Sequence, residues 1–222
     1  MDSTGHQLSL FGDDPENALA FVQSLDELAR EIRRCNRCPL AEERIRAVPG
    51  EGPEDAPVVF IGEGPGADED RTGRPFVGRA GRYFDEVLAK VGIPRSGIYI
   101  TNVVKCRPPG NRVPRPEEAA ACLPFLWRQI ELIRPKVLVL LGGVAARYVL
   151  KDGRGVGELR GTWHGPLKEA YVLVTYHPAG VLRDRRKEEE FLADMALVAR
   201  AYRKLMRQRS QNSRPKEFGK GV

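Results

Sequence analysis

Four cysteines are the residues of this 222-residue chain whose type and spacing most clearly indicate chemistry. Cys35 and Cys38 form a Cys-x-x-Cys pair, and Cys106 and Cys122 lie 16 positions apart. Four thiolates saturate a tetrahedral zinc ion or hold an iron–sulfur cluster, and an even cysteine count also fits two disulfides. Disulfides fit poorly, because nothing at the N-terminus marks export and cytosolic thiols stay reduced. The spacing predicts a metal or cluster site, and on spacing alone zinc is slightly favoured.

A glycine-rich loop follows a predicted strand at Gly62–Gly66. Its glycines do not fit the G-x-G-x-x-G register of a dinucleotide cradle, and Pro65 removes an amide that would face a phosphate. The loop therefore indicates a tight turn that brings backbone amides close to a small planar ligand. Glu63 would then be a hydrogen-bonding or water-positioning carboxylate.

Three further side chains have both an ordinary structural interpretation and a chemical one. Phe76, in a Gly/Pro-framed segment, fits core packing or a stacking platform for a base. Asn102 ends a predicted strand, where its amide can read a carbonyl and an N–H of a heterocycle. His177 precedes Pro178, which restricts the backbone and favours a rigid presentation. Each signal is weak alone, and their meeting at one sheet edge would be the stronger signal.

The hydrophobic pattern predicts the elements that would bring these residues together. Strands are expected at 57–62, 97–104, 136–141 and 171–175, and residues 157–162 fit a strand or an extended loop. Helices are expected at 24–35, 79–91, 116–133, 143–150 and 187–205. Strands that alternate with helices predict a three-layer α/β/α fold with a mostly parallel, four-stranded central sheet. In such sheets, ligands bind at the carboxyl ends of the strands.

The length fits one α/β domain with tails. We expect a disordered acidic tail at 1–21, a folded domain at 22–206 and a disordered basic tail at 207–222. Net charge is +6, and the basic C-terminal end suits a polyanion such as nucleic acid about as well as it suits simple solvation. The absence of a signal peptide or a long apolar run predicts a cytoplasmic protein with no membrane partner. We also expect a monomer.

Several separated motifs together resemble the family 4 uracil-DNA glycosylases. They are Gly62–Gly66 with Asp70, residues 73–78 (GRPFVG), residues 102–112 (NVVKCRPPGNR) and His177–Leu182. The resemblance covers about residues 24 to 205, so it implies that 22–206 form the glycosylase domain, with the superfamily's α/β fold. It also implies a [4Fe–4S] cluster, because all four cysteines stand at the family's cluster positions: Cys35, Cys38, Cys106 and Cys122.

The same resemblance implies an enzyme that flips uracil out of DNA and hydrolyses its N-glycosidic bond, which initiates base excision repair. Phe76 would stack on the flipped base, and Asn102 would pair with its Watson–Crick edge. The backbone at Gly62 and Gly64 would approach the base closely. His177 would stabilise the departing uracil anion, an electrostatic task of the oxyanion-hole kind.

The water-activating residue is left open by the sequence. Gly64 stands where the wider superfamily uses an aspartate, so catalysis would depend mainly on leaving-group stabilisation, with Glu63 able to orient water. A Schiff-base lyase step is not expected, because no lysine is expected in the pocket.

Contacts with DNA are expected from two loops. After His177, an apolar side chain would fill the gap left by the flipped base, and either Val181 or Leu182 fits this role. Arg183 would hold a phosphate. Arg107 and Arg112, in the loop between two cysteines, would also meet the backbone, although ordinary solvated charge is an equal alternative for each.

An apolar island interrupts the acidic N-terminal tail. It comprises Gln7, Leu8, Ser9, Leu10 and Phe11 and resembles the pentapeptide by which bacterial replication and repair proteins bind the sliding clamp. Short apolar anchors on a disordered segment suit a pocket that orders them on binding. A chance patch that packs back on the domain is the alternative.

Two other functions compete with hydrolytic excision. One is a related protein that traps uracil covalently through a histidine, but it carries an Arg/His-rich insertion after the first loop that is absent from 66–73. The other is a non-catalytic, zinc-dependent nucleic-acid-binding module. It would explain the cysteines and the charge but not Glu63, Phe76, Asn102 and His177 together.

Overall fold

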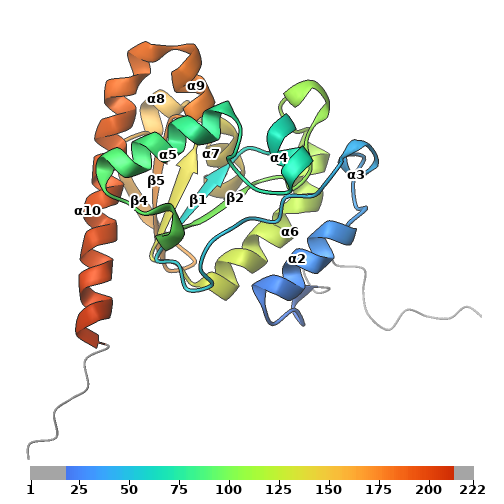
Figure 1. Ribbon diagram of the computed structural model, residues 1–222, viewed down its shortest axis with the longest axis horizontal. Helices are drawn as coiled ribbons and strands as arrows, with labels where there is room; N and C mark the ends of the chain where they lie inside the picture. The colour runs from blue at the N-terminus through green and yellow to red at the C-terminus, as the bar shows by residue number, and fades with distance from the viewer. Residues whose placement is uncertain (1–18, 213–222) are drawn as a thin grey trace, which may run out of the picture.

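The computed structural model describes residues 19–212, and a mostly parallel sheet forms its centre (Figure 1). The sheet has five strands in the order β2-β1-β3-β5-β4. Their bounds are β1 Val58–Gly62, β2 Tyr99–Asn102, β3 Val137–Leu141, β4 Trp163–Leu167 and β5 Ala170–Thr175. β1 pairs in parallel with β2 and β3, and β3 pairs in parallel with β5.

The prediction of a four-stranded sheet was wrong by one strand. β4 is an antiparallel edge strand on β5, whereas residues 157–162 form most of helix α8 and the turn after it. The sequence of β4, WHGPL, lacks the alternation or continuous apolar run of a core strand, because an edge strand buries little. All five of its residues are exposed or half-buried.

The five helices that the apolar periodicity predicts are present as α2, α5, α6, α7 and α10, and the short helices α3, α4, α8 and α9 were not predicted. Their bounds are α2 Leu25–Arg34, α3 Leu40–Glu43, α4 Ala67–Thr72, α5 Arg79–Val91, α6 Pro116–Ile133, α7 Gly143–Leu150, α8 Val156–Leu159, α9 Pro178–Arg183 and α10 Glu188–Asn212. Ser24 caps α2 by accepting a hydrogen bond from the Glu27 amide, and Pro116 occupies the first turn of α6.

Two apolar layers sandwich the sheet, which gives the expected three-layer α/β/α fold (Figure 1). Alternate β1 residues point to opposite faces: Val59 and Ile61 pack with α2, α6, α7 and α8, whereas Phe60 packs with α5, α9 and α10. On the second face, Phe60 and Phe84 pack edge to face with ring centroids 5.1 Å apart.

Both ends of the folded domain extend beyond the predicted boundaries. Leu19 is buried in the core, so the domain begins before residue 22. At the other end, α10 continues past the expected 205 through Asn212, although its last turns carry little apolar periodicity. None of the helices within 19–212 has the length and apolar character needed to cross a membrane.

The strand registers bring the carboxyl ends of the parallel strands together. Gly62 at the end of β1 lies beside Asn102 at the end of β2. Leu141 at the end of β3 pairs with Thr175 at the end of β5, two residues before His177. The chemistry-bearing loops therefore meet at one edge, as the parallel topology predicts.

Candidate functional site

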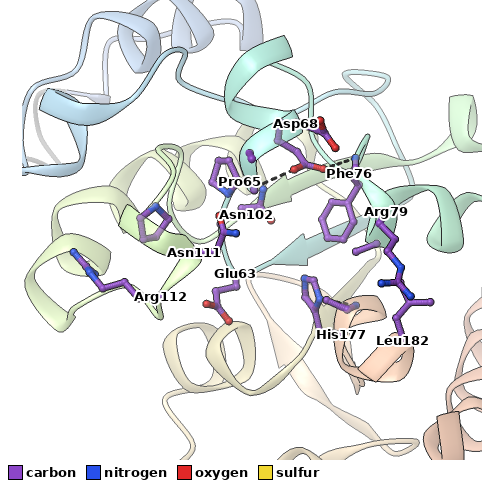
Figure 2. Close-up of a pocket in the computed structure, with 18 of the residues that line it drawn as sticks. Glu63, Pro65, Asp68, Phe76, Arg79, Asn102, Asn111, Arg112, His177 and Leu182 are labelled. Atoms are coloured by element: carbon purple, nitrogen blue, oxygen red, sulfur yellow. Dashed lines mark hydrogen bonds between the residues drawn. The ribbon is translucent and has the colours of Figure 1, made fainter. Parts of the chain in front are cut away.

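A cavity of about 570 Å³ opens at the carboxyl ends of the strands (Figure 2). Five of the six predicted uracil-binding residues line it together, and Gly62 does not: the five are Glu63, Gly64, Phe76, Asn102 and His177. They come from the loop after β1, the segment before α5, the end of β2 and the loop after β5. Its other lining residues include Glu69, Arg79, Asn111, Arg112, Val113, Leu182 and Arg183.

The side chain of Asn102 has a buried polar atom without a hydrogen-bond partner among the described residues. The residue is 1% exposed, and its Oδ1 is a buried acceptor without a hydrogen-bond partner within residues 19–212. Leaving a buried acceptor unpaired costs about 1–3 kcal/mol. Such an orphaned group at a cavity wall indicates a ligand that supplies the missing donor.

Phe76 lies next to this amide and has an unusual backbone conformation. Its φ is 51°, in the left-handed region that bulky residues rarely adopt. Arg95 holds the turn, because its guanidinium donates to the carbonyls of Pro75 at 2.7 Å and Phe76 at 3.4 Å. The ring is 5.6 Å from the His177 ring, centroid to centroid, and faces the cavity (Figure 2).

Gly62 is required by the approach of these two side chains. A Cβ at this position would overlap Asn102 Oδ1 and would lie 2.8 Å from Phe76 Cζ. Any side chain here would therefore displace the amide or the ring. The close approach at Gly62 is thus to two side chains of the protein, and Gly62 is not among the residues that line the cavity.

Glu69 connects the two loops that carry these residues. Its Oε1 accepts hydrogen bonds from the amides of Val77 and Gly78, both at 2.8 Å, and its Oε2 accepts from the Gly66 amide at 3.1 Å. The carboxylate is 9% exposed. It therefore fixes the glycine loop against the segment that presents Phe76.

His177 is held as a specific tautomer. Its Nδ1 accepts a hydrogen bond from the Ala179 amide at 3.1 Å, so in the neutral ring the proton is on Nε2. Burial, with a smaller contribution from the Arg183 guanidinium, lowers the pKa of His177 to about 4. At neutral pH the site therefore presents an uncharged imidazole with one N–H donor.

Glu63 lies on the opposite wall of the cavity from Phe76 (Figure 2). Burial raises the pKa of its carboxyl, and the Arg183 guanidinium opposes that increase. The neighbouring Gly64 has little room for a side chain, because a Cβ there would lie 2.7 Å from Val104 Cγ2. An aspartate at position 64 would require Val104 to move.

The loop between Cys106 and Cys122 forms one rim of the cavity. Arg112 is engaged inside the protein, because its guanidinium donates to both carboxylate oxygens of buried Glu118 at 2.8 and 2.6 Å. Arg107 lies outside the cavity lining, and its Nε donates to Asn111 Oδ1 at 2.8 Å. Both arginines thus stiffen the loop, and neither has a fully free guanidinium.

The two candidate wedge residues differ in exposure. Val181 is 0% exposed and packs in the core beneath α9, so it cannot enter DNA without unfolding that helix. Leu182 is half-buried at the cavity rim (Figure 2), and Arg183 beside it is exposed. Of these two side chains, only Leu182 lies at the cavity rim.

The four cysteines meet at a second, small cavity. Cys35, Cys38, Cys106 and Cys122 all line it, and none of the four is disulfide-bonded in this structure. Two N–H groups already point at sulfur: Arg44 Nη1 donates to Cys106 Sγ at 3.1 Å and the Lys105 amide donates to Cys122 Sγ at 3.3 Å. Burial raises the pKa of Cys122 to about 12, a penalty that a bound cation would reverse.

Four thiols that line one cavity are a donor set that either a zinc ion or an iron–sulfur cluster takes. Within 19–212, no group of three or more cysteine, histidine or carboxylate side chains is arranged to hold a metal ion. The chemistry of the donor set therefore fits both groups and does not choose between them.

Three contributors to these sites were not singled out from the sequence. Glu69 and Lys105 are charged residues that the fold buries, and Val113 is a 55% exposed aliphatic side chain at the cavity rim. A charged residue inside a motif of apolar and glycine residues is a weak sequence signal, because most such charges are solvated. Val113 has no distinctive signal.

Comparisons with known proteins identify what this architecture is similar to. A sequence profile described as the uracil DNA glycosylase superfamily matches residues 49–202. A type-4 uracil-DNA glycosylase of Archaeoglobus fulgidus is 43% identical over 187 residues, which cover 80% of this chain and 92% of the relative. A type-4 uracil-DNA glycosylase of Thermotoga maritima is 48% identical over 169 residues, which cover 74% of this chain and 86% of the relative. A type-5 uracil-DNA glycosylase of Thermus thermophilus is 35% identical over 153 residues, which cover 60% of this chain and 68% of the relative.

The depressed pKa of His177 makes stability dependent on pH. The folded-state value of about 4 lies below the ordinary 6.5, so between these values the unfolded chain binds more protons. We expect the free energy of unfolding to fall as the pH drops from 6.5 towards 4, with a His177 contribution of at most about 3 kcal/mol. Urea denaturation of the wild type and His177→Gln across this range measures it. Equal slopes in the two proteins would contradict the buried, neutral imidazole.

Proposed function

Because this chain belongs to the uracil-DNA glycosylase superfamily and to its type-4 family, we propose that it excises uracil from DNA. It would flip the nucleotide into the cavity at the strand ends and hydrolyse the N-glycosidic bond, the first step of base excision repair. The single observation that carries this proposal is the unpaired, buried Oδ1 of Asn102 at the cavity wall.

The Asn102 amide is complementary to uracil. Uracil presents an N3–H donor beside its O4 acceptor, and these match an amide oxygen and an amide N–H. Cytosine has an acceptor at N3, which would face the unpaired Oδ1 in the same orientation and leave both acceptors unsatisfied. Phe76, tilted over the cavity, supplies the apolar surface on which the flipped base stacks.

His177 would stabilise the leaving group. Cleavage of the N-glycosidic bond develops positive charge on the sugar and negative charge on the departing uracil. The Nε2–H of the neutral, pre-oriented imidazole can donate to a uracil carbonyl oxygen as that charge develops. A neutral donor loses no proton to the anion, and its orientation costs no reorganisation at the moment of reaction.

Glu63 is the carboxylate that would orient the attacking water. It lines the cavity together with two other carboxylates, Asp68 and Glu69. Both of those are engaged, because Asp68 pairs with the Arg71 guanidinium at 3.2 Å and Glu69 accepts backbone hydrogen bonds. Gly64, beside it, supplies no side chain for this purpose. No lysine is among the described residues that line the cavity, which supports hydrolysis without a Schiff-base step.

Leu182 and Arg183 would contact the DNA around the flipped nucleotide. Leu182 at the rim is an apolar side chain that can fill the vacated space in the base stack. The exposed guanidinium of Arg183 can hold a phosphate, and the stiffened Arg107–Arg112 loop would meet the backbone on the other side of the cavity.

The four-cysteine cavity would hold a [4Fe–4S] cluster. Cys35 and Cys38 from the end of α2, Cys106 after β2 and Cys122 in α6 would be its ligands. When bound, such a cluster cross-links these segments covalently through iron. The free state of all four thiols fits a reducing compartment, so we propose that the protein acts in the cytoplasm. We also propose that it is a monomer.

Excision of uracil from a labelled oligonucleotide tests the function directly. We expect the wild type to release uracil and leave an abasic site. Replacement of Asn102 by Leu or of His177 by Gln is expected to lower the single-turnover rate about 100-fold or more on single-stranded and duplex DNA alike, because each removes a hydrogen bond to the base or its anion. Leu182→Ala should slow excision from duplex DNA more than from single strands.

The two competing functions predict different outcomes of the same assay. A stable protein–DNA adduct without release would indicate covalent trapping. Binding without release or adduct would indicate a nucleic-acid-binding module.

Metal analysis of protein purified without oxygen tests the cluster. We expect about four iron and four acid-labile sulfide per chain and a broad visible absorption that zinc cannot give, because zinc has a filled d shell. Cys122→Ala should lose the iron and sulfide. Ala121→Ser is a matched control, because Ala121 lines the same cavity but supplies no ligand. Stoichiometric zinc with no sulfide would contradict the proposal.

Clamp binding is proposed from sequence alone, because Gln7, Leu8, Leu10 and Phe11 lie outside the described residues. We expect a peptide of this segment to bind a bacterial sliding clamp, and a peptide with Leu10 and Phe11 changed to Ala to lose that binding. Isothermal titration of both peptides measures it. No measurable binding of the wild-type peptide would end the proposal.

A further inference from the structure

Lys105 is a fully enclosed charged residue that none of the steps above uses. It is 1% exposed, and its Nζ donates three hydrogen bonds. The acceptors are Thr101 Oγ1 at 2.6 Å, the Asn102 carbonyl at 2.7 Å and Gln129 Oε1 at 2.7 Å. The ammonium is thus fully hydrogen-bonded, with a geometry that a chance burial would not provide.

None of these three acceptors carries a charge. A buried ammonium without a countercharge is costly, and buried charges are normally paired or placed beside ions. The ionisable groups that act electrostatically on Lys105 are the thiols of its neighbour Cys106 and of Cys122, and the Cys122 Sγ accepts a hydrogen bond from the Lys105 backbone amide at 3.3 Å. Lys105 also lines the cavity that the four cysteines share. Four thiolates around a cluster carry net negative charge, which supplies the missing countercharge.

The same side chain contacts the residue that reads the base. Its Nζ holds the carbonyl of Asn102, whose side-chain amide faces the other cavity. Val103 and Val104 lie between Asn102 and Lys105 in the sequence. Their backbone amides donate hydrogen bonds to the carbonyls of Gly62 and Glu63 at 2.9 and 3.1 Å, respectively. Five consecutive residues, 102–106, therefore run from the base-reading amide to a cysteine of the second site.

We propose that Lys105 is a positioning residue that couples the two sites, serving as the buried counter-charge of the four-cysteine cluster while its ammonium holds Asn102 in register for uracil. The proposal rests on the proposed function of both cavities. It assigns the cysteine site a specific effect on base recognition, in addition to cross-linking the fold.

Three variants separate this role from simple packing. Lys105→Met keeps the length of the aliphatic stem and removes the charge and the donors. Thr101→Val is the matched control, because it removes one partner of the same hydrogen-bond group and leaves the charge in place. Gln129→Glu keeps Lys105 and places a carboxylate against its ammonium, so it offsets the charge even if Lys105→Met fails to fold.

The midpoint potential of the cluster reports the charge. Loss of a nearby positive charge disfavours the added electron, so we expect the potential to fall in Lys105→Met and in Gln129→Glu and to stay unchanged in Thr101→Val. Purely structural damage would weaken the fold without this ordered response.

Binding of free uracil, measured as competitive inhibition, reports the position of Asn102. We expect Lys105→Met to weaken uracil binding about 10-fold to 100-fold at equal iron content, which is the usual effect of losing a residue that holds a ligand-contacting residue in place. Thr101→Val should change it little.

The outcomes distinguish the inference from the function on which it rests. A wild type that carries iron but releases no uracil would contradict the proposed function. The inference alone would be overturned by a different result: the wild type is active and loaded with iron, but neither Lys105→Met nor Gln129→Glu changes the cluster potential or the affinity for uracil.

Discussion

The parallel pairing of β1 with β2 is the constraint on which the functional site depends. It sets Gly62 directly beside Asn102, and the absence of a side chain at Gly62 is what leaves room for the amide and for the Phe76 ring. A one-residue slip would turn Asn102 to the opposite face of the sheet. The buried layers on both faces of the sheet oppose that slip, so the energy of the core is also what holds the recognition geometry.

Stiffness at this edge comes from charged groups that the protein satisfies internally. Glu69 joins the glycine loop to the Phe76 segment, Arg95 holds the turn at Phe76, and Glu118 fixes Arg112 in the rim loop. Each of these charges makes at least two hydrogen bonds, as buried or half-buried charges must. The cavity is therefore preformed, and the unpaired acceptor of Asn102 stands in a rigid frame that offers it no protein donor within residues 19–212.

Sequence reasoning predicted the elements with strong periodicity and failed where burial is asymmetric or set by distant contacts. Helices α5 and α7 and the buried strands were predictable, because continuous apolar runs and 3.6-residue spacing are local signals. The edge strand β4 and the late turns of α10 bury too little to show a pattern. The choice between Val181 and Leu182 depended on which way a short helix faces, and the roles of Glu69 and Lys105 depended on partners far along the chain.

One guanidinium adjusts both titratable groups of the proposed mechanism in the useful direction. Arg183 lowers the pKa of Glu63, which favours a charged carboxylate able to orient water, and lowers the pKa of His177, which favours a neutral donor. Burial disfavours any charged form, so it raises the pKa of Glu63 and lowers the pKa of His177. A single positive charge stabilises an anion and destabilises a cation, so Arg183 opposes the effect of burial at Glu63 and reinforces it at His177. A phosphate bound by Arg183 would weaken that field, so this residue's contact with DNA and its effect on the pocket are physically linked.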